Sequence, residues 1–137
     1  MDQDGTVMAA LADIVVAIHA AYVAFVVFGF VAIIAGGALG WRWVRNFWLR
    51  LAHLLAIAIV LAESLAGISC PLTTLENLLR ARADQSVYPG SFIGYWLDRM
   101  IFYTAPGWVF LVLYAGFTLV VVLTFWLVPP RRPSRAN

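Results

Sequence analysis

The sequence predicts an all-α integral membrane protein whose three transmembrane helices form a single domain over residues 1–137. Apolar runs cover residues 7–34, 47–68 and 108–128, and each reaches the ~20 residues that a helix needs to cross the hydrocarbon core. Hydrophobic residues make up 64% of the chain, which argues against a soluble globular protein. Arginines follow the first and third runs without accompanying acids, and this asymmetry predicts the orientation.

Ionisable residues interrupt the first two runs, whereas the third run has none. The first run contains 28 residues, so its helix must tilt, curve or extend past the membrane. It carries Asp13 and His19, and the second run carries Arg50, His53 and Glu63. Ionisable groups inside a bilayer are costly, so we expect them to face other helices and to have partners.

The basic residues of the chain are all arginine, and two acid-free groups of them flank the predicted spans. One group lies in or beside the first loop and the other in the tail, residues 129–137: Arg42, Arg45 and Arg50, and Arg131, Arg132 and Arg135. With three spans both groups face the same side. The positive-inside rule then predicts a cytoplasmic first loop and C-terminus, and an N-terminus outside. The lipid bilayer accounts for these charges, so we expect no nucleic-acid partner.

The second loop, residues 69–107, lies outside in this topology and is too long for a plain connector. Thr73 and Glu76 form a T-x-x-E capping box, which predicts a short amphipathic helix over about residues 74–83. Its apolar face would carry Leu75, Leu78 and Leu79, and the helix would lie at the membrane surface or on the bundle. A second short helix is predicted over about residues 91–102. The loop is either a cover over the outer end of the bundle or a docking surface or roof over a cavity.

His19 and Glu63 are predicted to form a buried polar pair. With helix centres near residues 22 and 58, their depths on antiparallel helices agree within about 3 Å. The pair could fix the register of the helices, or it could be a proton- or substrate-handling site in the outer half. Asp13 would lie near the outer surface, where Arg99 or backbone amides would be its partners.

His53 lies about 12 Å from His19 along the membrane normal, at 1.5 Å per residue. Haem b ligated by both histidines requires them to be nearly level, so this offset argues against it and against a metal site built from both. No cofactor or metal is therefore predicted. A haem shared with another subunit through His19 or His53 stays open. The simplest role for His53 is donation to a helix carbonyl or a lipid headgroup.

Cys70 is the only cysteine, so no intramolecular disulfide can form. Its place beside Pro71 predicts a buried structural thiol. The sequence contains no glycine-rich phosphate loop, no C-x-x-C and no recognisable Ser-His-Asp set. We therefore predict no catalytic residues and do not expect an enzyme.

The order of motifs resembles a known family. A histidine in each of the first two spans precedes L-A-E-S-L-A-G-I-S-C-P-L-T-T-L-E-N-L-L-R and then Y-P-G-S-F-I-G-Y-W-L-D-R-M-I-F-Y. Over about residues 10–130 this is similar to the domain of unknown function 2784 family of small bacterial inner-membrane proteins. Its most specific blocks are Cys70–Glu76 and Gly90–Ile93, and Tyr95 stands where members often carry histidine. The resemblance implies an inner-membrane location and no defined activity. It draws attention to His19, His53, Glu63, Cys70 and Glu76.

Two classes of function remain open. One is a structural or accessory membrane subunit, associated with other membrane subunits or with itself. The other is a carrier, sensor or redox component that uses the region of His19 and Glu63.

Overall fold

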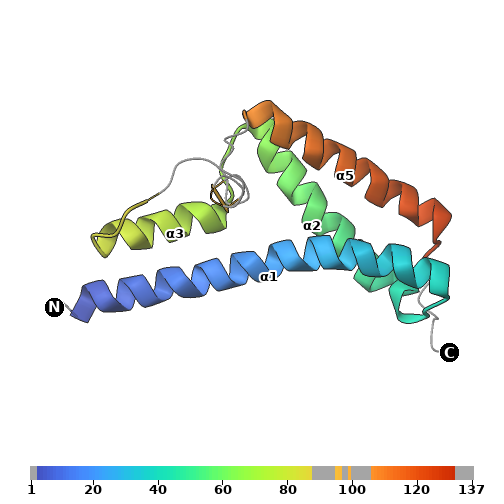
Figure 1. Cartoon of the computed structure of the whole chain (residues 1–137), viewed down its shortest axis with the longest axis horizontal. Coiled ribbons are helices and arrows are strands. Elements are labelled where there is room, and N and C mark those ends of the chain that lie inside the picture. Colours follow the sequence, from blue (N-terminus) through green and yellow to red (C-terminus); the bar gives the residue numbers. More distant parts are fainter. Residues whose placement is uncertain (1–2, 88–94, 97–98, 100–105, 132–137) are drawn as a thin grey trace.

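The computed structural model describes residues 3–87, 95–96, 99 and 106–131 of the chain. These residues form helices and connecting turns, and no β-strand occurs among them. The elements are α1 (Gln3–Leu39), the 3-10 helix η1 (Trp43–Arg45), α2 (Phe47–Ala66), α3 (Pro71–Arg82) and α5 (Gly107–Leu127), as Figure 1 shows. α1, α2 and α5 are long and apolar enough to cross a membrane, which confirms the predicted all-α class and the three candidate spans.

The ends of α1 and α2 follow from glycine. Gly40 and Gly67 have φ angles of 75° and 69°, a left-handed conformation that glycine adopts without strain and that ends a helix. The amide of Gly67 closes the last turn of α2 on the carbonyls of Glu63 and Ser64. α2 and α5 therefore match their predicted spans within two residues, whereas the 37-residue α1 extends beyond its apolar run at both ends.

The first loop and the end of α5 lie at the same end of the molecule. The amide of Arg131 donates to the carbonyl of Arg45 over 2.7 Å, beside an isolated bridge between Asn46 and Arg131. Asn46 also caps α2, because its side-chain oxygen accepts from the amides of Trp48 and Leu49. Arg131 of the tail group therefore lies beside Arg45 of the first-loop group. Arg132 and Arg135 lie outside the described residues.

A small apolar core forms where α2 and α5 pack together and the C-terminal half of α1 crosses them (Figure 1). Its buried members are Val26, Ala56, Ile57 and Val121. Phe30 and Phe117 pack beside it with ring centroids 4.8 Å apart. Most other apolar side chains of the three long helices remain exposed. Such a surface is typical of a protein that lipid surrounds, because packing between helices in lipid needs only part of each helix face.

α3 lies alongside the N-terminal half of α1 (Figure 1). It begins at Pro71, with Cys70 as N-cap, which is earlier than the predicted start near residue 74. The predicted capping box is wrong for this reason: proline is favoured in the first turn of a helix, so Thr73 and Glu76 fall inside the helix instead of capping it. Most of the second predicted loop helix, residues 91–102, lies outside the described residues, as does the block Gly90–Ile93.

Candidate functional site

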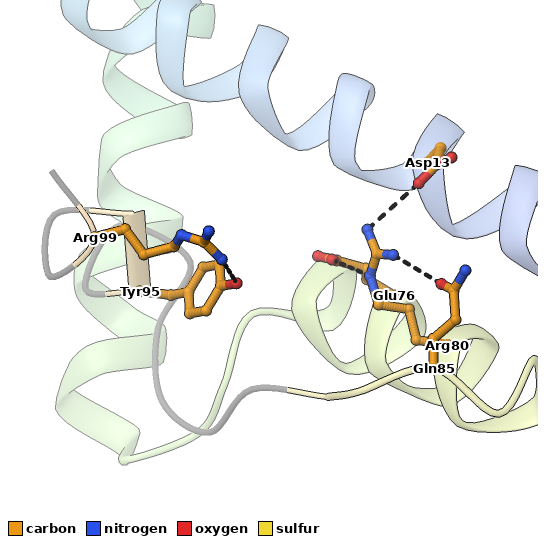
Figure 2. Close-up of polar contacts among 6 residues, drawn as sticks. All are labelled: Asp13, Glu76, Arg80, Gln85, Tyr95 and Arg99. Atoms are coloured by element: carbon orange, nitrogen blue, oxygen red, sulfur yellow. Dashed lines mark hydrogen bonds and ion pairs between the residues drawn. The ribbon is translucent and has the colours of Figure 1, made fainter.

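Arg80 is the centre of a polar cluster between α1 and α3. Its Nε donates to Oε1 of Glu76 over 2.8 Å, one helical turn away on α3. One terminal nitrogen donates to Oε1 of Gln85 over 3.0 Å, and the other reaches Oδ1 of Asp13 on α1 over 3.4 Å. Figure 2 shows the guanidinium group between these three acceptors. The cluster links two carboxylates on different helices through one cation.

Glu76 and His19 form the buried part of this cluster. Glu76 is 2% exposed and His19 is 6% exposed, and they interact electrostatically across the interface between α1 and α3. Thr73, one turn before Glu76 on the same face, is also buried. A carboxylate away from water is stable only with charged or hydrogen-bonded partners, and Arg80 supplies them.

The side of α3 that faces α1 is thus its polar side. The predicted apolar face points away instead, because Leu75 and Leu78 are 43% and 49% exposed. Residues three and four apart share a helix face, so the burial of Thr73 and Glu76 turns these leucines outward. The orientation of α3 follows from the charge partners that α1 offers, and helix periodicity alone does not contain that information.

Asp13 pairs with Arg80. Arg99, the partner expected for Asp13, instead donates to the hydroxyl of Tyr95 over 2.9 Å and lies over its ring (Figure 2). The expected pairing of Asp13 with Arg99 is therefore wrong. Tyr95 and Arg99 are four residues apart, a spacing at which side chains on a helix meet, and this local contact satisfies the guanidinium.

Glu63 has a different neighbour from the one expected. Its carboxyl group hydrogen-bonds to the thiol of Cys70, which follows α2 in the chain. Tyr22, one turn beyond His19 on α1, lies within electrostatic range of both groups and donates its hydroxyl proton to the carbonyl of Ala56. The direct pair between His19 and Glu63 stays a prediction. In the structure His19 interacts with Glu76, and Glu63 hydrogen-bonds to Cys70.

Cys70 is a free, partly buried thiol. Burial raises the pKa of this thiol, and the nearby Glu63 carboxyl raises it further, although the amides of Leu72 and Thr73 act in the opposite direction. A thiolate is the reactive form of cysteine, so a raised pKa makes the group less reactive near neutral pH.

His53 joins α2 to α1. Its Nε2 lies 2.7 Å from the carbonyl oxygen of Val26, and its ring packs edge-on to Phe25. A carbonyl only accepts, so Nε2 carries the proton, as expected for a histidine that donates to a helix carbonyl. Gly29 makes the approach possible, because a Cβ there would lie 2.8 Å from the ring. Val26 is about 10 Å along α1 from His19, close to the predicted offset of the histidines.

Arg50 is a structural contact that the sequence did not predict. The residue is 1% exposed and donates to the carbonyl of Val128 over 2.6 Å and to Oγ1 of Thr124 over 2.9 Å. It also lies over the Phe125 ring. A cation at the C-terminus of a helix satisfies its last carbonyls and its dipole, so Arg50 fixes the start of α2 to the end of α5. The indication in the sequence that Arg50 has a structural role was its position inside an apolar run.

Arg80, the centre of the cluster, and Tyr22, the neighbour of Glu63 and Cys70, were also missed. The spacing of Glu76 and Arg80, four residues on a predicted helix, indicated their pair. Nothing in the spacing indicated that Tyr22 would lie near Glu63 and Cys70. Within the described part of the chain, no group of three His, Cys, Asp or Glu side chains could hold a metal ion. The main interaction in the polar cluster around Arg80 is charge pairing.

The comparisons with known proteins agree with the resemblance seen in the motifs. A family model described as Protein of Unknown function (DUF2784) matches residues 9–130, which is most of the chain. No curated protein and no solved structure matches the chain.

Proposed function

The chain belongs to the DUF2784 family, whose function is unknown, and from the geometry of its polar cluster we propose that it is a structural or accessory subunit of a membrane assembly. The observation that carries this proposal is the internal pairing of the charges. Arg80 bridges Glu76 and Asp13, so one cation offsets part of the charge of two carboxylates while it holds α3 on α1. Such a site stabilises an arrangement of helices and does not leave a reactive group in a cleft.

The exposed apolar surface supports the same role. The long helices bury few of their residues within one chain, and bulky side chains such as Phe28 and Trp126 point outward. Lipid or other subunits would cover this surface. In our proposal the assembly lies in the bacterial inner membrane, with the N-terminus outside and the C-terminus in the cytoplasm. The arginines of the first loop and Arg131, which lie at one end of the molecule, support that orientation.

Native mass spectrometry of the protein extracted with its surrounding lipid tests the proposal. We expect a particle heavier than the 15.1 kDa of one chain, containing other subunits or further copies. The matched control is a sample whose cells were treated with a membrane-permeable cross-linker before extraction. A single-chain mass in both samples would contradict the proposal.

Proton or substrate handling is a second candidate, and one observation favours it. Tyr22, Glu63 and Cys70 adjoin the pair of His19 and Glu76, so ionisable groups continue along the side of α1 that α3 and α2 cover. A proton could move along such a row. In vesicles loaded with a pH-sensitive dye, this candidate requires proton flux above that of empty vesicles and a loss of flux in His19→Leu. Flux equal to that of empty vesicles would exclude proton transfer.

A further inference from the structure

α3 buries Thr73 and Glu76 and exposes Leu75 and Leu78, which is the reverse of a helix that lies against a protein in water. We propose that α3 is immersed in the hydrocarbon of the leaflet on the N-terminal side, with Leu75 and Leu78 in contact with lipid acyl chains. His19 and Glu76, the buried part of the polar cluster, then lie within the membrane between α1 and α3. A helix that covered the end of the bundle from the water side would need the opposite orientation of α3.

The depth of His19 supports this placement. The apolar run of α1, residues 7–34, is about 42 Å long as a helix, which exceeds the hydrocarbon thickness by about 12 Å, or about 8 residues. If the hydrocarbon ends at Ile34 on the inner side, its outer boundary falls near residue 15 and His19 lies about 6 Å inside it. Arg80 contacts Asp13 and Glu76 interacts with His19, so α3 runs antiparallel to α1 and Leu75, next to Glu76, lies near the depth of His19.

The surface of α1 beside α3 supports the same conclusion. Leu11, Ile14 and Ile18 are exposed at the levels where Asp13 meets Arg80 and His19 meets Glu76. Leu75 and Leu78 are exposed on α3 as well, so both helices present bulky apolar side chains outside their shared interface. Large exposed apolar patches are rare on proteins surrounded by water. In this proposal, lipid acyl chains cover the exposed apolar side chains of both α1 and α3.

The two ends of α3 suit such a position. The helix has 12 residues, so it is about 18 Å long, roughly half of the hydrocarbon thickness. Its C-terminal end carries the exposed Arg82 and is followed by the exposed Asp84 and Gln85. Arg80 extends toward Asp13, whose side chain is 74% exposed. Long basic side chains reach the interface from within the membrane in this way.

Spin labels on single cysteines test the depth of α3. In full-length protein with Cys70→Ala, reconstituted in phosphatidylcholine vesicles, labels are placed at Leu78→Cys and, separately, at Leu75→Cys. Ile18→Cys on α1 is the lipid-facing reference, and Ser86→Cys, exposed beyond the end of α3, is the water-facing reference. Collision rates are measured with oxygen, which concentrates in lipid, and with a water-soluble nickel chelate.

We expect the ratio of oxygen to nickel collisions at Leu78 and Leu75 to match that at Ile18 and to exceed that at Ser86. A ratio equal to that at Ser86 would place the leucine face in water and overturn the proposal. Labels that neither reagent reaches would mean that protein covers this face, which also overturns it. Two labelled positions keep the result interpretable if one variant does not fold.

Discussion

His19 on α1 and Glu76 on α3 are both almost fully buried, and they interact across the interface between the two helices. Glu76 lies on a helix too short to cross the membrane, so spans alone could not supply this partner. The relationship places the polar cluster between α1 and α3. It also means that the buried histidine and the amphipathic loop helix belong to one site.

A double-mutant cycle should identify the partner of His19. We expect His19→Leu and Glu76→Leu to show a coupling energy of about 0.5–3 kcal/mol, because each variant removes the same interaction. The cycle of His19→Leu with Glu63→Leu should give a smaller coupling. The measurement is the free energy of unfolding in mixed micelles with increasing dodecyl sulfate. A coupling energy that is larger for His19 with Glu63 than for His19 with Glu76 would instead support the pair of His19 and Glu63 that was predicted from their depths.

Arg80→Ala should destabilise the protein by about 3 kcal/mol or more, because it leaves the buried Glu76 carboxylate without its cation. Arg82→Ala is the matched control, since Arg82 is exposed on the same helix. Its substitution should change stability by less than about 0.5 kcal/mol. Thermal unfolding in detergent, followed by circular dichroism, measures both. Equal stability of the two variants would show that the ion pair is not important for the fold.

Gly29→Ala should weaken the contact between α1 and α2. The new Cβ would lie 2.8 Å from the His53 ring, which Val26 and Phe25 hold in place. We expect a loss of about 1–3 kcal/mol, typical of overpacking. Gly116→Ala is the control, because a Cβ at this position on α5 meets nothing within 4 Å. That variant should be neutral or slightly stabilising, since alanine favours helix over glycine.

Cys70 should react slowly with maleimide at pH 8. Burial favours the neutral thiol and raises its pKa, so the reactive thiolate is scarce at this pH and increases as the pH rises further. The reference is the same protein unfolded in dodecyl sulfate, where the thiol regains its ordinary pKa. The labelling rate of the folded protein should therefore keep increasing above the pH at which the unfolded protein levels off. Equal rates at pH 8 would contradict the burial of this group.

The spans were predictable from sequence because length and apolarity alone determine whether a helix can cross a bilayer. Both ends of α2 and α5 fall within two residues of the expectation, and Asn46 and Gly67 supply the local reasons for α2. The bounds of α1 were less predictable, since polar residues at its N-terminus continue the helix beyond the apolar run.

The site was predictable only in its composition. Arithmetic at 1.5 Å per residue gives the depth of His19 but not the direction in which its side chain points. The direction follows from the docking of α3, which depends on tertiary contacts between Asp13, Arg80 and Glu76. The side that the leucines of α3 face was left open for the same reason. Their periodicity identifies a face, and only the neighbouring helix decides which face is covered.

Hydrogen exchange over residues 73–82 in lipid nanodiscs tests most directly whether the polar face of α3 is held on α1 by Arg80. In the wild type we predict exchange as slow as in α2, because the helix is packed and its amides are bonded. In Arg80→Ala we predict faster exchange in α3, with α2 unchanged. Rapid exchange throughout residues 73–82 of the wild type, or identical exchange of α3 in both proteins, would contradict this arrangement.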